Sequence, residues 1–261
     1  MSKLKNKKGF FIFLMVLLFL LISHNEIIKV SEKIRVELYG EPISNYGKIN
    51  NNYFNIDSSG NRECAKEINT AIKYAYKNNI KDLKMEKGKY LINGISSDIN
   101  SNETDIKKGV VLFSNITLDL NGSIVKIQQN DKVNYAVLSV YDIENVTIQN
   151  GIIEGDKEEH NYNNRKSTHE WGFGIDIRGS RNVKINNMEI YNCTGDGIII
   201  TDYIDRNNYS KNITIKNTEI HNCRRNGISV ISAEEVEISD NSIYEISGTS
   251  PRFSNYYGIL G

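Results

Sequence analysis

Apolar and polar residues alternate over the second half of the chain, and one such pattern returns at a fixed interval. Asn182–Ile190 followed by Gly197–Ile200 is repeated 30 residues later as Asn212–Ile220 followed by Gly227–Val230. Alternation at period two is typical of β-strands, because neighbouring side chains of a strand point to opposite faces. Repetition of short strands at one interval predicts a solenoid, in which each repeat packs against its neighbours.

The same template fits once upstream and once downstream, so its apolar positions form columns. Three columns result: Val146, Val183, Ile213 and Val236; Ile148, Ile185, Ile215 and Ile238; and Ile153, Ile190, Ile220 and Ile243. Coils stacked about 4.8 Å apart would bury these columns in one continuous core. A turn column holds Asn150, Asn187, Asn217 and Asp240, and stacked amides can form a hydrogen-bonded ladder. The pattern predicts an all-β protein, a parallel β-helix.

The N-terminus has a different composition. Several lysines precede the uncharged apolar run Gly9–Ile22, which suits the apolar part of a secretory signal and is shorter than the ~20 residues needed to span a bilayer. We expect residues 1–30 to be a signal peptide or signal anchor and the protein to be secreted or held at the cell surface. Membrane contact is expected only through this segment, if it is not cleaved.

Residues 31–60 are polar and predict a stem or linker. From residue 61, apolar residues occur at helical spacing on one face, namely Cys64, Ala65, Ile68, Ala71, Ile72 and Ala75. They predict a helix of about 15 residues, with Asn61 as its N-cap. Within residues 61–108, this helix and the first strands would cap the open end of the solenoid. Residues 109–261 would form the coils.

Two segments resemble known families. Glu86–Ile92, together with the helix and strand before it, resembles the opening segment of pectate-lyase-like right-handed β-helix proteins, and the resemblance extends over residues 56–261. His169–Ile175 is similar to a segment of bacterial glycosyl-hydrolase-like β-helix proteins. The resemblance implies a right-handed helix and, by analogy, a polysaccharide as substrate or ligand.

Insertions into the repeat gather around one stack of strands. The connections Ile153–Gly174 and Ile243–Gly258 are longer than their equivalents in the other coils, and so is Gly197–Asn212. All three border the strands opened by Gly174, Gly197, Gly227 and Gly258. Insertions on one face of a solenoid commonly surround a binding site, so this stack is the predicted groove.

Side chains suited to carbohydrate chemistry are predicted along this groove. The candidate catalytic residues are Asp196, Asp176, Glu170, His169 and Asp156. The candidate substrate-binding residues are His160, Trp171, Arg178, Asp202, Asn226, Arg225 and Tyr257. Paired carboxylates can supply the acid and base of glycoside hydrolysis, and aromatic faces can stack on sugar rings. Asp196 is the leading candidate, with its partner left open among Asp176, Glu170 and Asp156. The alternative for Asp196 is a turn residue that bonds its own backbone.

The histidines and the tryptophan each have two interpretations. His160 and His169 lack the spacing of a helical metal pair, and we expect no metal site there. Either histidine could act as a base, bind a sugar hydroxyl or pack the loop. Trp171 could be a sugar platform or the anchor of the long loop, and the anchor is favoured.

The resemblance to polygalacturonases is incomplete. Where those enzymes present several carboxylates and a histidine at the starts of successive strands, only Asp196 matches, so standard polygalacturonase activity is not expected. A lyase-like elimination would use Ca²⁺ and a basic residue. For that reaction Asp176, Asp202, Arg178 and Arg225 are available, and otherwise no cofactor is expected.

Composition narrows the partners. The chain has 32 basic and 32 acidic residues and no basic stripe, which argues against nucleic acid. Of its three cysteines, Cys193 and Cys223 share a repeat column. They could bridge, but two small buried residues in equivalent positions are favoured.

The sequence ends with Gly258–Gly261, shortly after a groove strand begins. We expect a truncated C-terminus whose uncapped apolar end promotes self-association. Four functions stay open: a polysaccharide hydrolase, a lyase or epimerase, a non-catalytic glycan-binding or adhesion protein, and an inactive remnant.

Overall fold

The computed structural model describes residues 24–94, 109–163, 168–204 and 207–247. The chain divides into two units, Met1–Pro42 and Ile43–Gly261. In the first unit the described part is mainly the helix α2 (His24–Tyr39). No helix within the described ranges is long and apolar enough to cross a membrane. The predicted signal run Gly9–Ile22 lies outside the described residues.

The second unit begins earlier than the sequence predicted. It opens with α3 (Asn51–Phe54) and β1 (Ser59–Glu63). Apolar side chains in this stretch are buried, among them Ile43, Ile49 and Phe54. The prediction of a stem up to residue 60 is therefore wrong for residues 43–60, because their apolar side chains belong to the core of the second unit.

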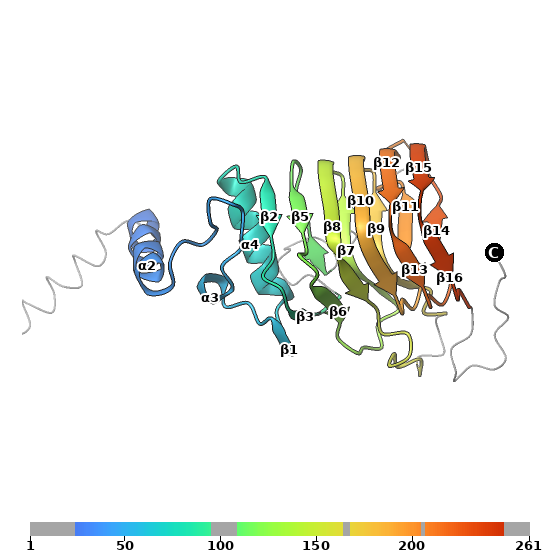
Figure 1. The fold of residues 1–261 in the computed structure, drawn as a ribbon, viewed down its shortest axis with the longest axis horizontal. Helices are drawn as coiled ribbons and strands as arrows, with labels where there is room; N and C mark the ends of the chain where they lie inside the picture. The colour runs from blue at the N-terminus through green and yellow to red at the C-terminus, as the bar shows by residue number, and fades with distance from the viewer. Residues whose placement is uncertain (1–23, 95–108, 164–167, 205–206, 248–261) are drawn as a thin grey trace, which may run out of the picture. The chain divides into compact units, whose positions relative to one another are not determined.

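The predicted amphipathic helix is α4 (Ala65–Lys77), which lies at the N-terminal end of the strand stack (Figure 1). Its predicted apolar face is buried. The helix begins at Ala65, so the prediction of Asn61 as N-cap is wrong: Asn61 belongs to β1, and the Glu63 carboxylate accepts the Ala65 N–H at 2.8 Å. Asn69 of α4 accepts the Val111 N–H at 2.8 Å, which joins the helix to the first strand of the smaller sheet.

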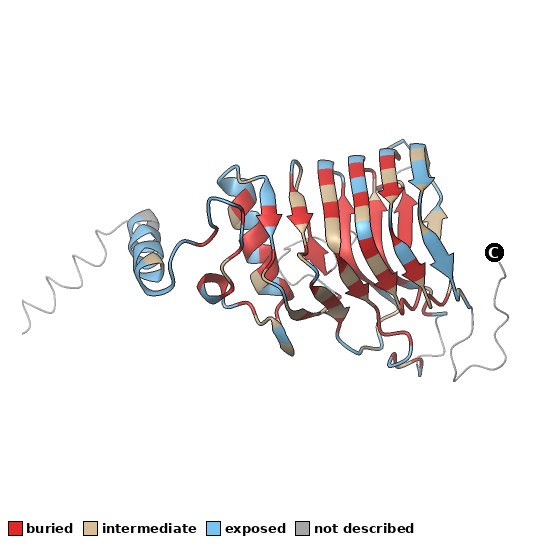
Figure 2. Cartoon of the chain, in the orientation of Figure 1, coloured by how far each residue is buried: buried red, intermediate tan, exposed pale blue. Residues whose placement is uncertain are grey.

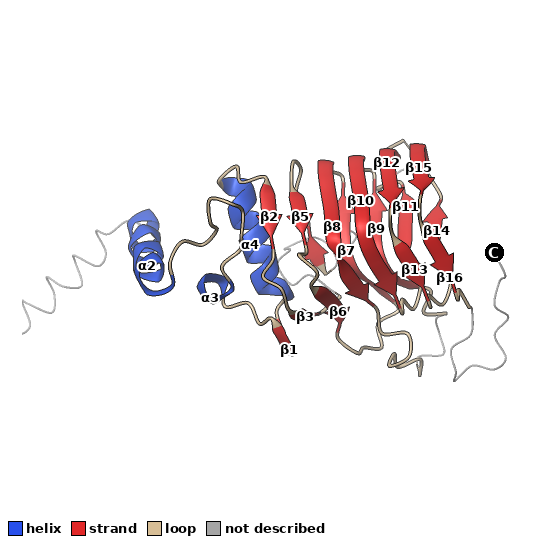
Figure 3. Ribbon diagram, in the orientation of Figure 1, coloured by secondary structure: helices blue, strands red, loops and turns tan. Residues whose placement is uncertain are grey.

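The strands form two parallel sheets, an architecture visible in Figure 3. Besides β1, the large sheet contains β2 (Asp82–Lys84), β3 (Lys89–Ile92), β5 (Thr117–Asp119), β6 (Ile124–Ile127), β8 (Glu144–Glu154), β10 (Arg181–Tyr191), β12 (Ser210–Lys216), β13 (Glu219–His221), β15 (Ala233–Ser239) and β16 (Ser242–Tyr244). The small sheet contains β4 (Val110–Val111), β7 (Asn134–Tyr141), β9 (Trp171–Arg178), β11 (Ile198–Thr201) and β14 (Ile228–Val230). Each coil contributes to both sheets, as a parallel β-helix requires.

The predicted columns are confirmed by the strand register. Val183 pairs with Val146 on one side and with Ile213 on the other, and the remaining columns pair in the same way. These side chains are fully buried in the middle coils, whereas β15 and β16 are largely exposed (Figure 2). Ile238 and Ile243 continue the core columns but are 43% and 45% exposed.

Asparagines with positive φ set the corners of the coils. The predicted turn column has φ values of 59° at Asn150, 52° at Asn187 and 49° at Asn217, a left-handed conformation that asparagine tolerates well. The Asn187 side chain donates to the Asn150 side chain at 2.8 Å, as a ladder predicts. Asn217 departs from the ladder, because it donates to Asn186 at 3.0 Å.

A second ladder, not predicted, lies at the start of the template. Asn182 donates to Asn145 at 2.9 Å, and Asn212 donates to Asn182 at 2.8 Å. These residues also have positive φ. Asn222 likewise donates to Asn192 at 3.1 Å. Amide contacts at several corners therefore hold neighbouring coils in one register.

Gly197, which directly precedes β11, is required by close packing. A Cβ on Gly197 would lie 2.6 Å from the Ile220 methyl carbon Cγ2, so only glycine fits. Cys193 and Cys223 fill equivalent niches nearby as buried, free thiols. The interpretation as two small buried residues holds, and the disulfide does not form.

Replacing a column residue should destabilise the solenoid strongly. Ile185 is fully buried in the middle of its column, so Ile185→Ala should reduce the free energy of unfolding by about 2–5 kcal/mol. Chemical denaturation would measure the loss. Lys184→Ala, at an exposed position of the same strand, is the control and should cost well under about 1 kcal/mol. Equal losses in both variants would contradict this packing.

Candidate functional site

The strand register aligns the residues of the small sheet in columns across neighbouring coils. Asp176 pairs with Ile199, Ile199 with Ser229, and Arg178 with Thr201. Asp176 and Ile199 are nevertheless buried. The prediction that Asp176 lines the groove is therefore wrong, because its side chain is buried.

Asp196 lies in the turn before β11 and is fully buried. Its Oδ1 accepts the Asn226 backbone N–H at 3.1 Å and lies 3.6 Å from Arg225 Nε. Asp196 Oδ2 and Arg225 Nη1 are buried polar atoms with no hydrogen-bond partner in the described part of the chain. Buried polar groups are nearly always paired, so this turn has hydrogen-bonding capacity for a further molecule.

The protonation of Asp196 is shifted by its surroundings. Burial raises its pKa, and the opposing effects of the Arg225 charge and of the hydrogen bonds from Ser229 and Asn226 do not cancel that rise. Desolvation disfavours the charged form of a carboxyl group. Asp196 therefore holds its proton to higher pH than an exposed aspartate does.

The flanking glycines explain how this turn is packed. A Cβ on Gly195 would lie 2.4 Å from the Glu170 carbonyl oxygen, and the Gly195 N–H donates to the Gly172 carbonyl at 2.7 Å. The Asp196 turn is thus held directly against the segment 170–172. Glu170 itself is half-buried.

Trp171 shares this turn region. The Arg225 guanidinium carbon lies 5.6 Å from the Trp171 ring centroid, a cation–π distance. Trp171 also meets Phe173 edge to face at 6.2 Å, yet it is 43% exposed. Both interpretations of Trp171 therefore have support, since the ring packs on its neighbours and still offers surface. Next to it, the Asn226 side chain donates to Ser229 Oγ at 3.0 Å.

Three of the predicted residues come together inside the long loop. The Asp156 carboxylate lies 2.9 Å from His160 Nδ1, and His160 Nε2 lies 2.9 Å from His169 Nδ1. The Tyr135 hydroxyl donates to Asp156 and lies 2.6 Å from the Thr194 hydroxyl. All five residues are buried. The chain of bonds ties the loop to the coil beneath it and offers no open surface.

Asp176 is also committed to internal bonds. It accepts from Arg178 Nε at 2.8 Å and from the Tyr141 hydroxyl at 2.5 Å. Burial raises the pKa of that hydroxyl, so Tyr141 remains the donor. Further along, Thr201 donates to the half-buried Asp202 at 2.7 Å. No group of three or more metal-ligating side chains exists among the residues the structure describes, and Tyr257 lies outside them.

Sequence reasoning missed the partners of these carboxylates. Tyr135 and Tyr141 lie at either end of β7, a strand that the repeat template does not reach. One signal was present: Tyr135 pairs with Gly172, where a Cβ would lie 2.5 Å from the tyrosine ring. The absence of a side chain at position 172 leaves room for the ring of Tyr135, which lies over the backbone of Gly172.

Comparison with known proteins identifies a family, two related sequences and solved structures that share the fold. A family model for the right-handed β-helix region matches residues 93–260. The SPbeta prophage-derived uncharacterized protein YorA of Bacillus subtilis (strain 168) is 36% identical over 142 residues, 53% of this chain and 24% of YorA. The chain spans about a quarter of the length of the curated relatives it matches.

Solved structures share the fold at low sequence identity. An iota-carrageenase complexed to iota-carrageenan fragments is 15% identical with a TM-score of 0.52, covering 79% of this chain and 40% of that one. The A-module of the mannuronan C-5 epimerase AlgE6 of Azotobacter vinelandii is 14% identical with a TM-score of 0.51, covering 73% and 56%. Such identities establish the fold alone.

The raised pKa of Asp196 predicts a pH-dependent stability difference. Because the folded-state pKa lies above the ordinary 3.8, ionised Asp196 costs stability at neutral pH, and the cost disappears as the pH falls through the folded pKa toward 3.8. Asp196→Asn should therefore melt at a higher temperature than the wild type at pH 7. The advantage should vanish on acidification in thermal melts followed by circular dichroism.

The control for this experiment is Asp82→Asn, which changes an exposed carboxylate of β2. It should leave the melting temperature nearly unchanged across the same pH range. A lower melting temperature of Asp196→Asn at pH 7 would show that the Arg225 contact outweighs the cost of burial.

Proposed function

The chain belongs to the right-handed β-helix family, since the family model matches residues 93–260, and on this premise we propose that it is an exported, polysaccharide-active protein of glycoside hydrolase type. The glycan would bind at the Asp196 turn, beside Trp171 and Arg225, and Asp196 would be the general acid. The basic, apolar N-terminus supports export. Matches to a carrageenase and an epimerase support a polysaccharide as the substrate class.

The observation that carries the proposal is the state of Asp196. A glycosidase acid must hold a proton near neutral pH and give it to the leaving oxygen, and burial is the usual way to raise its pKa. Asp196 is buried, has a raised pKa and keeps one oxygen unpaired. The unpaired Arg225 N–H beside it could hold a sugar oxygen in place.

The second carboxylate is best supplied by Glu170. Asp156 and Asp176 are both held by internal hydrogen bonds. Glu170 lies in the segment that packs directly against the Asp196 turn. Trp171, next in the chain and partly exposed, would stack on a sugar ring and place the scissile bond between the two carboxyl groups.

Binding without turnover is the second candidate. It is favoured by the complete burial of Asp196, because an acid must reach the glycosidic oxygen. A ligand that only rests on Trp171 and Asn226 would need no such access. The two candidates differ in whether products form.

Polysaccharide turnover tests the proposal. The full chain would be incubated with plant, algal and bacterial polysaccharides, with and without Ca²⁺, while reducing ends and the absorbance of unsaturated products are followed. We expect new reducing ends without new absorbance. On the substrate that responds, Asp196→Asn should lower the rate by at least about 100-fold, the scale of general acid catalysis. The rate should fall as the pH rises above the Asp196 pKa, because the acid must be protonated.

Asp82→Asn is the control and should keep the wild-type rate. Calcium-dependent absorbance would indicate elimination and replace the proposal. Glycan binding with no product from folded protein would establish the second candidate.

A further inference from the structure

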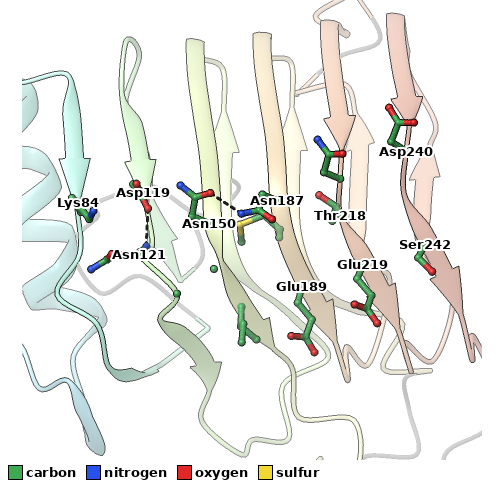
Figure 4. A pocket seen from close by; sticks show the side chains of 15 residues that line it. Lys84, Asp119, Asn121, Asn150, Asn187, Glu189, Thr218, Glu219, Asp240 and Ser242 are labelled. Atoms are coloured by element: carbon green, nitrogen blue, oxygen red, sulfur yellow. Dashed lines mark hydrogen bonds between the residues drawn. The ribbon is translucent and has the colours of Figure 1, made fainter.

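A separate groove runs over the large sheet, on a surface that the Asp196 turn does not share. It has a volume of about 730 Å³ and follows the corner formed by the Asn150, Asn187 and Asn217 column. Figure 4 shows its side chains rising in a row from successive coils, from Lys84 on β2 to Ser242 on β16. The groove is therefore elongated along the solenoid axis.

The floor of this groove is a row of side-chain amides. Asn187 donates one N–H to Asn150 at 2.8 Å (Figure 4). A side-chain amide has two N–H donors and a carbonyl with two acceptor sites, so the ladder uses only part of its capacity. Asn217 continues the column in the next coil and donates one N–H to Asn186 at 3.0 Å, so side-chain amides follow one another along the groove at the coil spacing of about 4.8 Å. Such a row matches a linear polymer with hydroxyl groups on each unit.

One side of the groove is built from ordered carboxylates. Glu189 and Glu219 are directly paired on β10 and β13. Two residues further on, the rings of Tyr191, His221 and Tyr244 stack at 5.1 Å and 5.0 Å, with planes within 7° and 6° of parallel. His221 Nε2 lies 3.3 Å from Glu189 Oε1, and the Tyr244 hydroxyl donates to Glu219. The stack therefore holds both carboxylates in place as acceptors.

The negative charge of the groove lining favours an uncharged polymer over an anionic one. The lining contains four carboxylates, Asp119, Glu189, Glu219 and Asp240, and one lysine, Lys84. Like charges on paired strands are unfavourable, and an anionic polymer would add to that repulsion. Uncharged sugars can donate hydroxyl protons to the same oxygens without repulsion.

We propose that this groove is a second glycan-binding site, which takes a linear, uncharged oligosaccharide lying along the solenoid axis. The sugar hydroxyls bond to the amide ladder and to Glu189 and Glu219. The site does not depend on the Asp196 turn or on catalysis there, so it would serve to hold a chain on the protein surface.

The chain offers a matched pair of variants for the test. Asn187 and Asn182 lie in the same coil, have φ values of 52° and 53°, and each donate one ladder bond, of 2.8 Å and 2.9 Å. Only Asn187 lines the groove. Glycine keeps the positive φ at either position. Asn182 also accepts from Asn212 at 2.8 Å, so Asn182→Gly should lose at least as much stability as Asn187→Gly, and a binding loss seen only in Asn187→Gly cannot come from lost stability.

The experiment is a calorimetric titration of the full chain with hexasaccharides of β-1,4-linked glucose and β-1,4-linked xylose, with hexagalacturonate as the anionic probe. A neutral probe should bind, and hexagalacturonate should bind at least about tenfold more weakly. Asn187→Gly should weaken binding of the neutral probe by about five- to tenfold, the scale of one or two hydrogen bonds. Asn182→Gly should bind as the wild type does, and Asp196→Asn should keep the binding event that Asn187→Gly weakens.

Three results would overturn the proposal. They are the absence of binding by either neutral probe, equal affinities for Asn187→Gly and Asn182→Gly, and loss of binding in Asp196→Asn, which would place the sugar on the small sheet. Hydrolysis can fail in Asp196→Asn while binding in the groove persists, so this site and the proposed activity are tested separately.

Discussion

The in-register stacking of one coil on the next is the constraint on which the molecule depends. A strand that slipped by one residue would turn its apolar column outward. The register is held where asparagine adopts positive φ at several corners of the middle coils and its amide bonds to the coil before. Because the corners are fixed, Val183 and Ile185 meet the same column in every neighbour, and the outward residues fall into equally defined rows.

The long loop before β9 uses this rigid base to place polar groups where a solenoid would otherwise bury only apolar ones. Asp156, His160 and His169 form a buried hydrogen-bonded chain, and a fully satisfied network of this kind fixes a unique conformation. That conformation brings Trp171 over Arg225 and presses the loop against Asp196. The cost is the desolvation of Asp196, a local conflict that natural proteins tend to keep at functional sites.

The sequence predicted the repeating part of the molecule well, because period-two alternation and a constant offset are both visible in the residues. Strand pairing and the core columns follow from them, and the capping helix follows from the helical spacing of its apolar residues. The sequence-based prediction failed where a repeat residue contacts a segment that does not follow the repeat template. Tyr141 comes from a strand that the template does not reach, so the burial of Asp176 could not be seen. Nor does the polar composition of residues 43–60 reveal that their few apolar side chains are buried.

The asparagine column also links structure to binding. The residues that set the corner of each coil are the same ones that line the large-sheet groove, so a ligand lying along it would contact several coils at once. In a solenoid, stability is approximately a sum of repeat and interface terms. A molecule that bridges coils binds only when their interfaces are formed, and by linkage it stabilises those interfaces. Glycan binding along the axis would thus stabilise the interfaces between the coils that line the groove.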